Sequence, residues 1–143
     1  MAGKSNKKRR FVGLPYNMVS TRQFASLSSK AVKLLIDLSL QRNGHNNGKL
    51  SACWTLMKQR GWKSSASVYR ARKELIDAGF LIITRTGLKK RGHATLVAVT
   101  WDGIDDCCVD YDAGITPSNI PLSYWCKHPS ARKALPKLRA VNG

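Results

Sequence analysis

The sequence predicts an α+β fold in which a small helical core carries one antiparallel β-hairpin. Two segments with helical periodicity, residues 52–60 and 64–78, follow one another with Gly61 between them. Two segments rich in strand-forming residues, 80–86 and 93–101, come next and are separated by a glycine-bounded basic turn. A chain of 143 residues has room for one such core and not for two.

The helix predicted over residues 64–78 is amphipathic. Ser64 or Ser65 can cap its first turn with a side-chain oxygen, and Gly79 can take the left-handed conformation that ends a helix. The apolar stripe that would face the core consists of Val68, Ala71, Leu75 and Ile76. Arg72 lies at the rim of this stripe.

The opposite side of this helix suits contact with DNA. Small hydroxyls near a helix start can bond to phosphates, and longer cationic side chains one turn on can reach base edges in a major groove. We therefore assign the following residues to DNA recognition: Ser64, Ser65, Ser67, Tyr69, Arg70 and Lys73. The alternative is an ordinary solvated helix face.

The turn between the two predicted strands carries three adjacent bases. Positive charges this close repel each other, and the phosphate backbone beside a DNA groove would offset the repulsion. We assign this turn and the histidine just after it to phosphate contact: Lys89, Lys90, Arg91 and His93. A solvated basic turn is the alternative.

The upstream half of the predicted domain supplies the remaining core elements. Residues 28–41 have a broad apolar stripe at helical spacing, so we expect them to form the first buried helix. A polar turn at 42–48 leads to a short third strand at 49–51. In the helix at 52–60, we expect these side chains to point inward: Cys53 or Trp54, Leu56 and Met57.

Three helices followed by a hairpin, over residues 14–101, are the outline of a winged helix-turn-helix domain: a three-helix core with a small antiparallel β-hairpin wing. The segment 64–81 resembles the recognition helix, glycine and first wing strand of bacterial winged-helix DNA-binding proteins, and the chain resembles small helix-turn-helix proteins of plasmids, prophages and integrative elements. The most specific part is an arginine-alanine pair followed by Leu75 and by Gly79 with Phe80. The resemblance implies that the helix faces a DNA groove and that the basic turn forms the wing. It carries over no effector-binding or catalytic motif.

Three further segments flank this domain. Residues 1–13 form a basic arm, expected to be disordered when free and to follow a minor groove. Its DNA-binding residues are Lys7, Lys8, Arg9 and Arg10. Residues 102–116 form an acidic linker that we expect to stay off the DNA or to lie against a basic arm. Residues 117–143 form an extended basic, proline-containing tail, in which Tyr124 and Trp125 are expected to anchor it to the domain or to the second subunit of a homodimer.

The charge of the chain points to a polyanion as its partner. The net charge of +17 arises from 25 Lys and Arg against 8 Asp and Glu. Five of these acids fall between Asp102 and Asp112, so the rest of the chain carries 25 bases against 3 acids, a net charge of +22. Such a chain repels itself unless a partner of opposite sign binds. RNA is also a polyanion and would offset the charge equally well. Only the predicted winged helix-turn-helix pattern favours duplex DNA over RNA.

Other classes of function find little support in the sequence. The carboxylates at 102–112 lack the glycine turn and terminal glutamate of a calcium loop. The possible zinc ligands Cys107, Cys108, Cys126 and His128 lack the usual two-residue spacer. The histidines lie apart and no glycine-rich phosphate loop occurs, so we expect no enzyme, no metal or other cofactor and no small-molecule effector. No apolar run approaches the roughly 20 residues of a membrane helix, so we expect no membrane association and a cytoplasmic location.

Three functions are compatible with this interpretation. The first, which we favour, is a sequence-specific double-stranded DNA-binding regulator of transcription on a mobile element, which would act by occupying an operator. The second is a plasmid or phage replication or partition accessory protein that binds repeated origin sites. The third is an RNA-binding protein, or an inhibitor that docks on another protein through a winged-helix surface.

Overall fold

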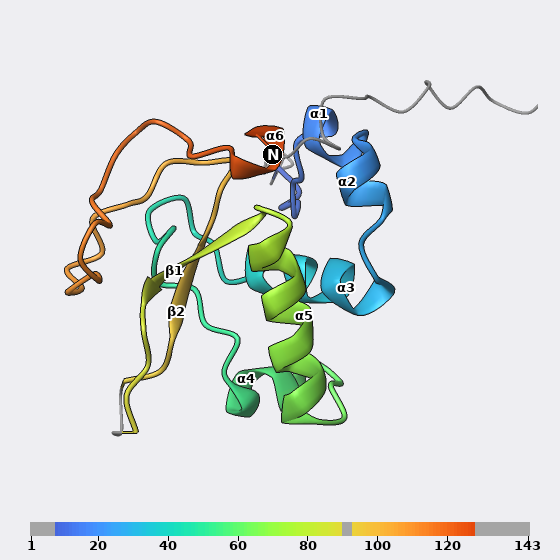
Figure 1. The fold of residues 1–143 in the computed structure, drawn as a ribbon, viewed down its shortest axis with the longest axis horizontal. Helices are drawn as coiled ribbons and strands as arrows, with labels where there is room; N and C mark the ends of the chain where they lie inside the picture. The colour runs from blue at the N-terminus through green and yellow to red at the C-terminus, as the bar shows by residue number, and fades with distance from the viewer. Residues whose placement is uncertain (1–7, 90–92, 128–143) are drawn as a thin grey trace, which may run out of the picture.

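The structure is a computed structural model that describes residues 8–89 and 93–127 (Figure 1). Its helices are, in chain order, α1 (Tyr16–Val19), α2 (Arg22–Ala25), α3 (Ser29–Ser39), α4 (Trp54–Gln59), α5 (Ser65–Asp77) and α6 (Tyr124–Lys127). Its strands are β1 (Leu81–Arg85) and β2 (Leu96–Val99). Several helices and one antiparallel hairpin make an α+β fold, as the sequence predicts. No helix in the described ranges combines the length and apolar character that crossing a membrane requires.

The helix ends follow the capping signals of the sequence. Ser64 is the N-cap of α5, and its Oγ accepts a hydrogen bond from the backbone N–H of Ser67 at 3.2 Å. Ser28 caps α3 in the same way through the N–H of Ala31, also at 3.2 Å. Gly79 has a φ of +86°, which lets the chain turn sharply from α5 into β1. These local signals set the limits of α5, the helix on which the candidate site is built.

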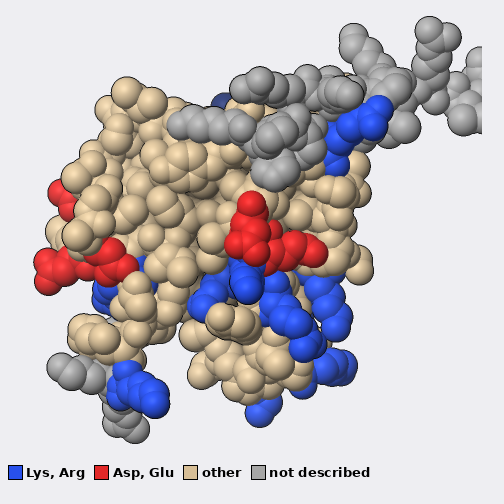
Figure 2. Space-filling model, viewed as in Figure 1, with Lys and Arg blue, Asp and Glu red and all other residues tan. Residues whose placement is uncertain are grey.

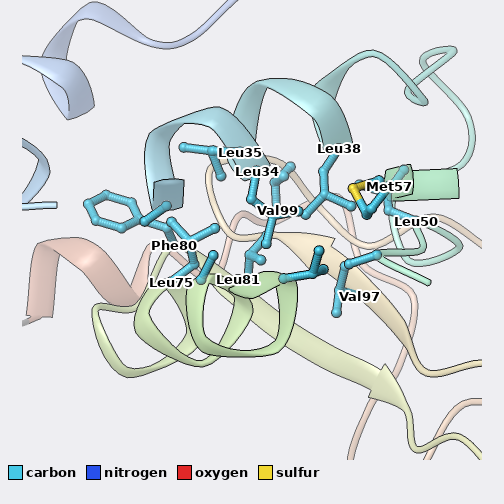
Figure 3. Close-up of a cluster of buried hydrophobic side chains, with 14 of the residues drawn as sticks. Leu34, Leu35, Leu38, Leu50, Met57, Leu75, Phe80, Leu81, Val97 and Val99 are labelled. Atoms are coloured by element: carbon cyan, nitrogen blue, oxygen red, sulfur yellow. The ribbon is translucent and has the colours of Figure 1, made fainter. Parts of the chain in front are cut away.

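The core lies between α3, α5 and the hairpin (Figure 3). Its fully buried side chains include Leu34, Leu35, Leu38, Leu50, Met57, Leu75, Phe80, Leu81, Val97 and Val99. Phe24 of α2 meets Phe80 edge-on, with ring centroids 5.8 Å apart. Each buried aliphatic side chain of this size stabilises the fold by about 1.5–3 kcal/mol. The packing therefore holds α5 in a set position on α3 and the hairpin.

Helix α4 buries fewer side chains than the sequence predicts. Met57 is buried, as expected, and Trp54 is half-buried. Leu56 is 39% exposed, so the prediction that it points inward is wrong. Cys53 is the half-buried N-cap residue of α4 and does not belong to the core. With 6 residues, α4 is so short that it turns only a narrow side toward the core.

The strands β1 and β2 pair antiparallel but are shorter than predicted. Regular pairing ends at Arg85 and Leu96, because the next residue, Thr86, bonds outside the hairpin. The backbone N–H of Thr86 donates to the carboxylate of Asp112 at 2.8 Å, and the Thr86 hydroxyl donates to the same oxygen at 2.6 Å. The hairpin is thus tied at its middle to the segment that follows it.

The predicted third strand at residues 49–51 is reduced to a single antiparallel bridge. Leu50 and Val97 exchange two backbone hydrogen bonds, of 3.1 and 2.8 Å. The bridge fixes the chain that leads into α4 against β2. Helix α4 therefore begins beside the hairpin and ends beside the start of α5.

The core extends past the predicted domain boundary at Trp101. Trp125 is 6% exposed and belongs to the core cluster, which confirms that it anchors the tail to the domain. Its neighbour Tyr124 is 40% exposed. The close approach depends on Gly79, because a Cβ there would lie 2.8 Å from the backbone nitrogen of Trp125. Residues far beyond the hairpin thus complete the end of the core where α5 turns into β1.

The acidic segment 102–112 lies along the domain. Asp102 forms an ion pair with Arg42, and Asp105 accepts a hydrogen bond from the backbone N–H of Asn47 at 2.7 Å. In the part of the chain that the structure describes, this segment is therefore laid against the polar turn before Leu50 and against the hairpin. Its carboxylates join parts of the domain to one another.

Candidate nucleic-acid interface

The exposed side of α5 carries four of the six residues that the sequence assigns to recognition on this helix. Ser65, Tyr69, Arg70 and Lys73 are all exposed, Tyr69 at 58%. The pairs 65/69, 69/73 and 70/73 are three or four residues apart, which places all four on one side of the helix, named here the α5 face. Arg70 and Lys73 form no hydrogen bond or ion pair with the described part of the chain. Both cations are therefore free to meet an anionic partner.

The other two residues, Ser64 and Ser67, do not lie on the α5 face. Ser64 is half-buried as the N-cap. Ser67 is 9% exposed, its Oγ lies 2.9 Å from the Oγ of Ser64, and it accepts a hydrogen bond from Nζ of Lys30 at 3.5 Å. The prediction that Ser67 faces a DNA groove is wrong, because α3, which carries Lys30, packs against this side of the first turn.

The turn between α4 and α5 is held by a buried carboxylate that the sequence pattern does not reveal. Asp37 of α3 is 3% exposed. It accepts hydrogen bonds from three donors: Lys33 Nζ at 2.7 Å, Trp62 Nε1 at 2.9 Å and Arg60 Nε at 3.0 Å. Burial by itself raises the pKa of Asp37, but these donors outweigh burial and hold the pKa below its ordinary value. The carboxylate is therefore charged at neutral pH. It fixes the turn between α4 and α5 and so sets the orientation of α5.

Lysine and arginine side chains gather around the lower half of α5 in Figure 2, and acidic side chains lie above them on the same face. Besides the cations of the α5 face, the exposed Lys58 and Lys63 of α4 and the following turn border its N-terminal half. The acids Glu74 and Asp77 belong to its last turns. A polyanion would therefore be attracted to the N-terminal half of α5 and repelled from its C-terminal end.

Most acids of the chain are engaged within the fold, whereas most of the bases in the described ranges are not. Six of the eight acids accept hydrogen bonds or form ion pairs: Asp37, Glu74, Asp102, Asp105, Asp106 and Asp112. Among the described bases, Lys33, Arg42 and Arg60 form ion pairs, and Lys30 and Arg85 donate hydrogen bonds within the fold. The surface is therefore left with a large positive charge that the fold itself does not neutralise.

The basic turn of the hairpin is described in part. Lys89 is exposed, His93 is half-buried, and the N–H of Leu88 donates to the carbonyl of His93 at 2.9 Å. Lys90 and Arg91 lie outside the described residues. The structure thus places two of the four predicted phosphate-contact residues at the end of the hairpin, and His93 lines a groove there together with the acids Asp110 and Asp112.

The basic arm is described from residue 8 onward. Its exposed cations are Lys8, Arg9 and Arg10. Lys7 lies outside the described residues. Phe11, which follows these cations, is 85% exposed, and Met18 in α1 is the first fully buried side chain of the described chain. The described part of the arm therefore presents its charges to solvent.

The described side chains among the possible metal ligands do not converge. In the described ranges, no group of three or more His, Cys, Asp or Glu side chains could hold an ion. Cys107 is half-buried and points to the carbonyl of His45, with Sγ and O 3.8 Å apart, while Cys126 is exposed. His128 lies outside the described residues.

Comparisons with known proteins do not assign this surface. No protein-family model, curated protein or solved structure matches the chain. What is known of the surface is therefore its exposure, its unpaired cations and the buried contacts that hold it.

Proposed function

We propose that this chain is a sequence-specific protein that binds double-stranded DNA through a winged helix-turn-helix domain. In this proposal α3, α4 and α5 form the three-helix core, α5 is the recognition helix and the hairpin is the wing. The observation that carries the proposal is the α5 face, where Arg70 and Lys73 are exposed and have no partner in the described chain. The major groove is about 12 Å wide and admits an α-helix.

Cations on both sides of the α5 face support this proposal. Lys58 lies in the last turn of α4, Lys63 lies in the turn before α5, and Lys89 lies near the tip of the hairpin. Phosphates line both edges of a major groove. A recognition helix therefore needs basic side chains on either side of it to set its register on the DNA. The acids at the end of α5 would then point away from the DNA phosphates. This arrangement would orient the helix with its N-terminal half toward the DNA bases.

The role that best fits a protein of this kind is regulation of transcription on a mobile element, in the cytoplasm. A small domain with a basic reading helix can act by occupying an operator and excluding other proteins. A homodimer through the C-terminal tail would let it bind a palindrome, because a two-fold axis in the protein matches one in the DNA.

The test is selection of bound sequences from a pool of random duplex DNA, at a stated salt concentration and with RNA as competitor. We expect one short enriched motif that RNA does not displace. A palindromic motif would support the regulator, and direct repeats would support an accessory role in replication or partition. Absence of any enriched motif, with equal competition by RNA, would contradict sequence-specific DNA binding.

A further inference from the structure

A small groove opens on the flank of α5 that faces α4. It has a volume of about 200 Å³, and the side chains that line it include Cys53, Trp54, Ser65, Tyr69 and Arg72. Arg72 lies in the groove, with its guanidinium carbon 5.3 Å from the centre of the Tyr69 ring. This is the distance of a cation–π contact, in which a cation rests over the face of an aromatic ring. Two neighbouring side chains of the same helix thus form a stacked pair at the edge of the α5 face.

The position of Arg72 in the helix explains this arrangement. Tyr69 and Arg72 are three residues apart, and side chains at that spacing are neighbours on a helix surface. The neighbouring Val68 and Ala71 are buried, so the side chain of Arg72 leaves the helix beside the core and is half-buried along the groove. Tyr69, whose ring lies against this guanidinium, is 58% exposed. The pair is therefore held between the core and the surface that we assign to DNA.

The guanidinium of Arg72 has no acidic partner in the described chain. It forms no ion pair or hydrogen bond there, and it rests instead on the Tyr69 ring. Of the acids in the same helix, Glu74 accepts hydrogen bonds from Ser28, and Asp77 lines the separate groove on the α2 side of α5. The side chain of Arg72 is held in position, but its five N–H donors have no acceptor in the described chain. These donors can therefore bind acceptors outside the protein.

We propose that Arg72, positioned by Tyr69, recognises a guanine through its major-groove edge. The inference rests on the proposed function and names one base contact within it. Guanine presents two acceptors there, N7 and O6, and the planar fork of an arginine matches them with two parallel hydrogen bonds. Because Tyr69 already restrains the guanidinium, less side-chain freedom is lost on binding than for a fully mobile arginine. Arg72 thus adds a specificity-determining residue that the exposed strip alone does not include.

A phosphate contact is the competing role for an arginine on this helix, and the two roles differ in what a mutation changes. A base contact discriminates between sequences at one position, whereas a phosphate contact strengthens binding to all sequences. The number of phosphates bound sets the slope of log affinity against log salt concentration, at about −0.9 for each. Arg72→Ala should therefore lower discrimination at one base pair and leave this slope unchanged.

The experiment uses the full chain and the motif selected from random duplexes. Each G·C pair of the motif is changed in turn to A·T, and affinity is measured for the wild type, Arg72→Ala and Arg72→Gln, the last of which keeps most of the stem. In the wild type, one change should weaken binding by about 5- to 150-fold, the discrimination expected of a bidentate arginine–guanine contact. Both variants should lose the discrimination at that pair and keep it at the others.

Variants of the ring test the positioning role of Tyr69. Tyr69→Phe keeps the aromatic face, so discrimination at that same pair should persist. Tyr69→Ala removes the aromatic face and should reduce the discrimination at that pair. Arg22→Ala, which removes an exposed cation of α2, should leave this discrimination unchanged. Thermal melting of each variant verifies that the fold is intact.

Two results would overturn the inference while leaving DNA binding in place. One is full discrimination at every pair in both Arg72 variants. The other is uniformly weaker binding to all sequences with a flatter salt dependence, which would make Arg72 a phosphate contact. If the wild type selects no duplex motif at all, the proposed function fails together with the base contact, and that outcome is visible before any variant is made.

Discussion

The side-chain amide of Asn47 pairs with both backbone groups of Val99. Its Nδ2 donates to the Val99 carbonyl at 3.1 Å, and its Oδ1 accepts from the Val99 N–H at 2.9 Å. The same Nδ2 donates to the carbonyl of Gly103 at 2.8 Å. Asn47 is 1% exposed and Val99 is fully buried, so water cannot substitute for the two bonds between them. One buried side chain therefore joins the turn before α4 to the last residue of β2 and to the chain beyond it.

Replacing Asn47 with alanine should destabilise the protein strongly. The change leaves the N–H and the carbonyl of Val99 buried without this partner, and each buried unsatisfied group costs about 1–3 kcal/mol. We expect the free energy of unfolding, measured by chemical denaturation, to fall by on the order of 3 kcal/mol. Asn17→Ala, at an exposed position of α1, is the control and should change stability little. Equal stability of the two variants would show that the Asn47 bonds contribute nothing net.

The buried Asp37 should make stability depend on pH in the acid range. Its pKa is lowered in the folded protein, so the stabilisation it provides is complete above its unfolded pKa of about 4 and is lost as pH falls through the lower folded value. At neutral pH, Asp37→Asn should cost about 3 kcal/mol, because two cations lose their buried partner. The difference in the free energy of unfolding between wild type and variant should become smaller below about pH 4. Asp110→Asn, at an exposed site, should show no such narrowing, and a difference for Asp37→Asn that is the same at all pH values would refute the assignment.

Removal of the Trp125 side chain should destabilise the domain although this residue lies beyond the hairpin. Trp125 is 6% exposed, and truncating a buried tryptophan to alanine costs about 3–5 kcal/mol. Tyr124→Ala is the matched control at the adjacent, 40% exposed position and should cost less. Calorimetry measures both variants. A Trp125 variant that melts with the wild type would mean that the tail is not part of the core.

Loss of the two free cations of the α5 face should weaken specific DNA binding. Arg70→Ala and Lys73→Ala should each cost about 1–3 kcal/mol on the selected motif if they contact bases, with relaxed preference at one position. Titration of labelled duplexes measures the affinity, and Arg22→Ala in α2 controls for the loss of one positive charge. Unchanged affinity and selectivity in both folded variants would exclude the α5 face from the groove.

Neutralising the basic turn of the hairpin should have a different effect. With Lys89, Lys90 and Arg91 all changed to alanine, we expect weaker binding to every sequence and a flatter salt dependence, by about 0.9 in slope for each phosphate that the turn no longer binds. The double variant Lys89→Arg with Lys90→Arg keeps the charge and should keep the slope. If the triple variant retains the wild-type slope, the hairpin does not touch the backbone.

The elements that could be predicted from the sequence are those whose causes are local. The Ser64 cap, the apolar stripe of α5 and the stop at Gly79 depend on residues within a few positions of one another, so they need no knowledge of the tertiary structure. The exposed positions of Tyr69, Arg70 and Lys73 follow from the same helical periodicity. The hairpin was predictable in kind but not in length, because Asp112, 26 residues from Thr86, ends the strand pairing.

Packing between distant segments settles which polar residues serve the fold and which remain for a partner. Ser67 and Arg72 belong to a helix whose periodicity the sequence reveals, yet contact with Lys30 buries the first, and stacking on Tyr69 in the groove beside α4 places the second. Asp37 accepts a hydrogen bond from Trp62, which lies 25 residues along the chain. Asn47 bonds to Val99, which lies 52 residues along it. A buried polar group is stable only when its partners arrive from other parts of the chain. Such partnerships depend on the tertiary structure, and spacing along the sequence does not encode them.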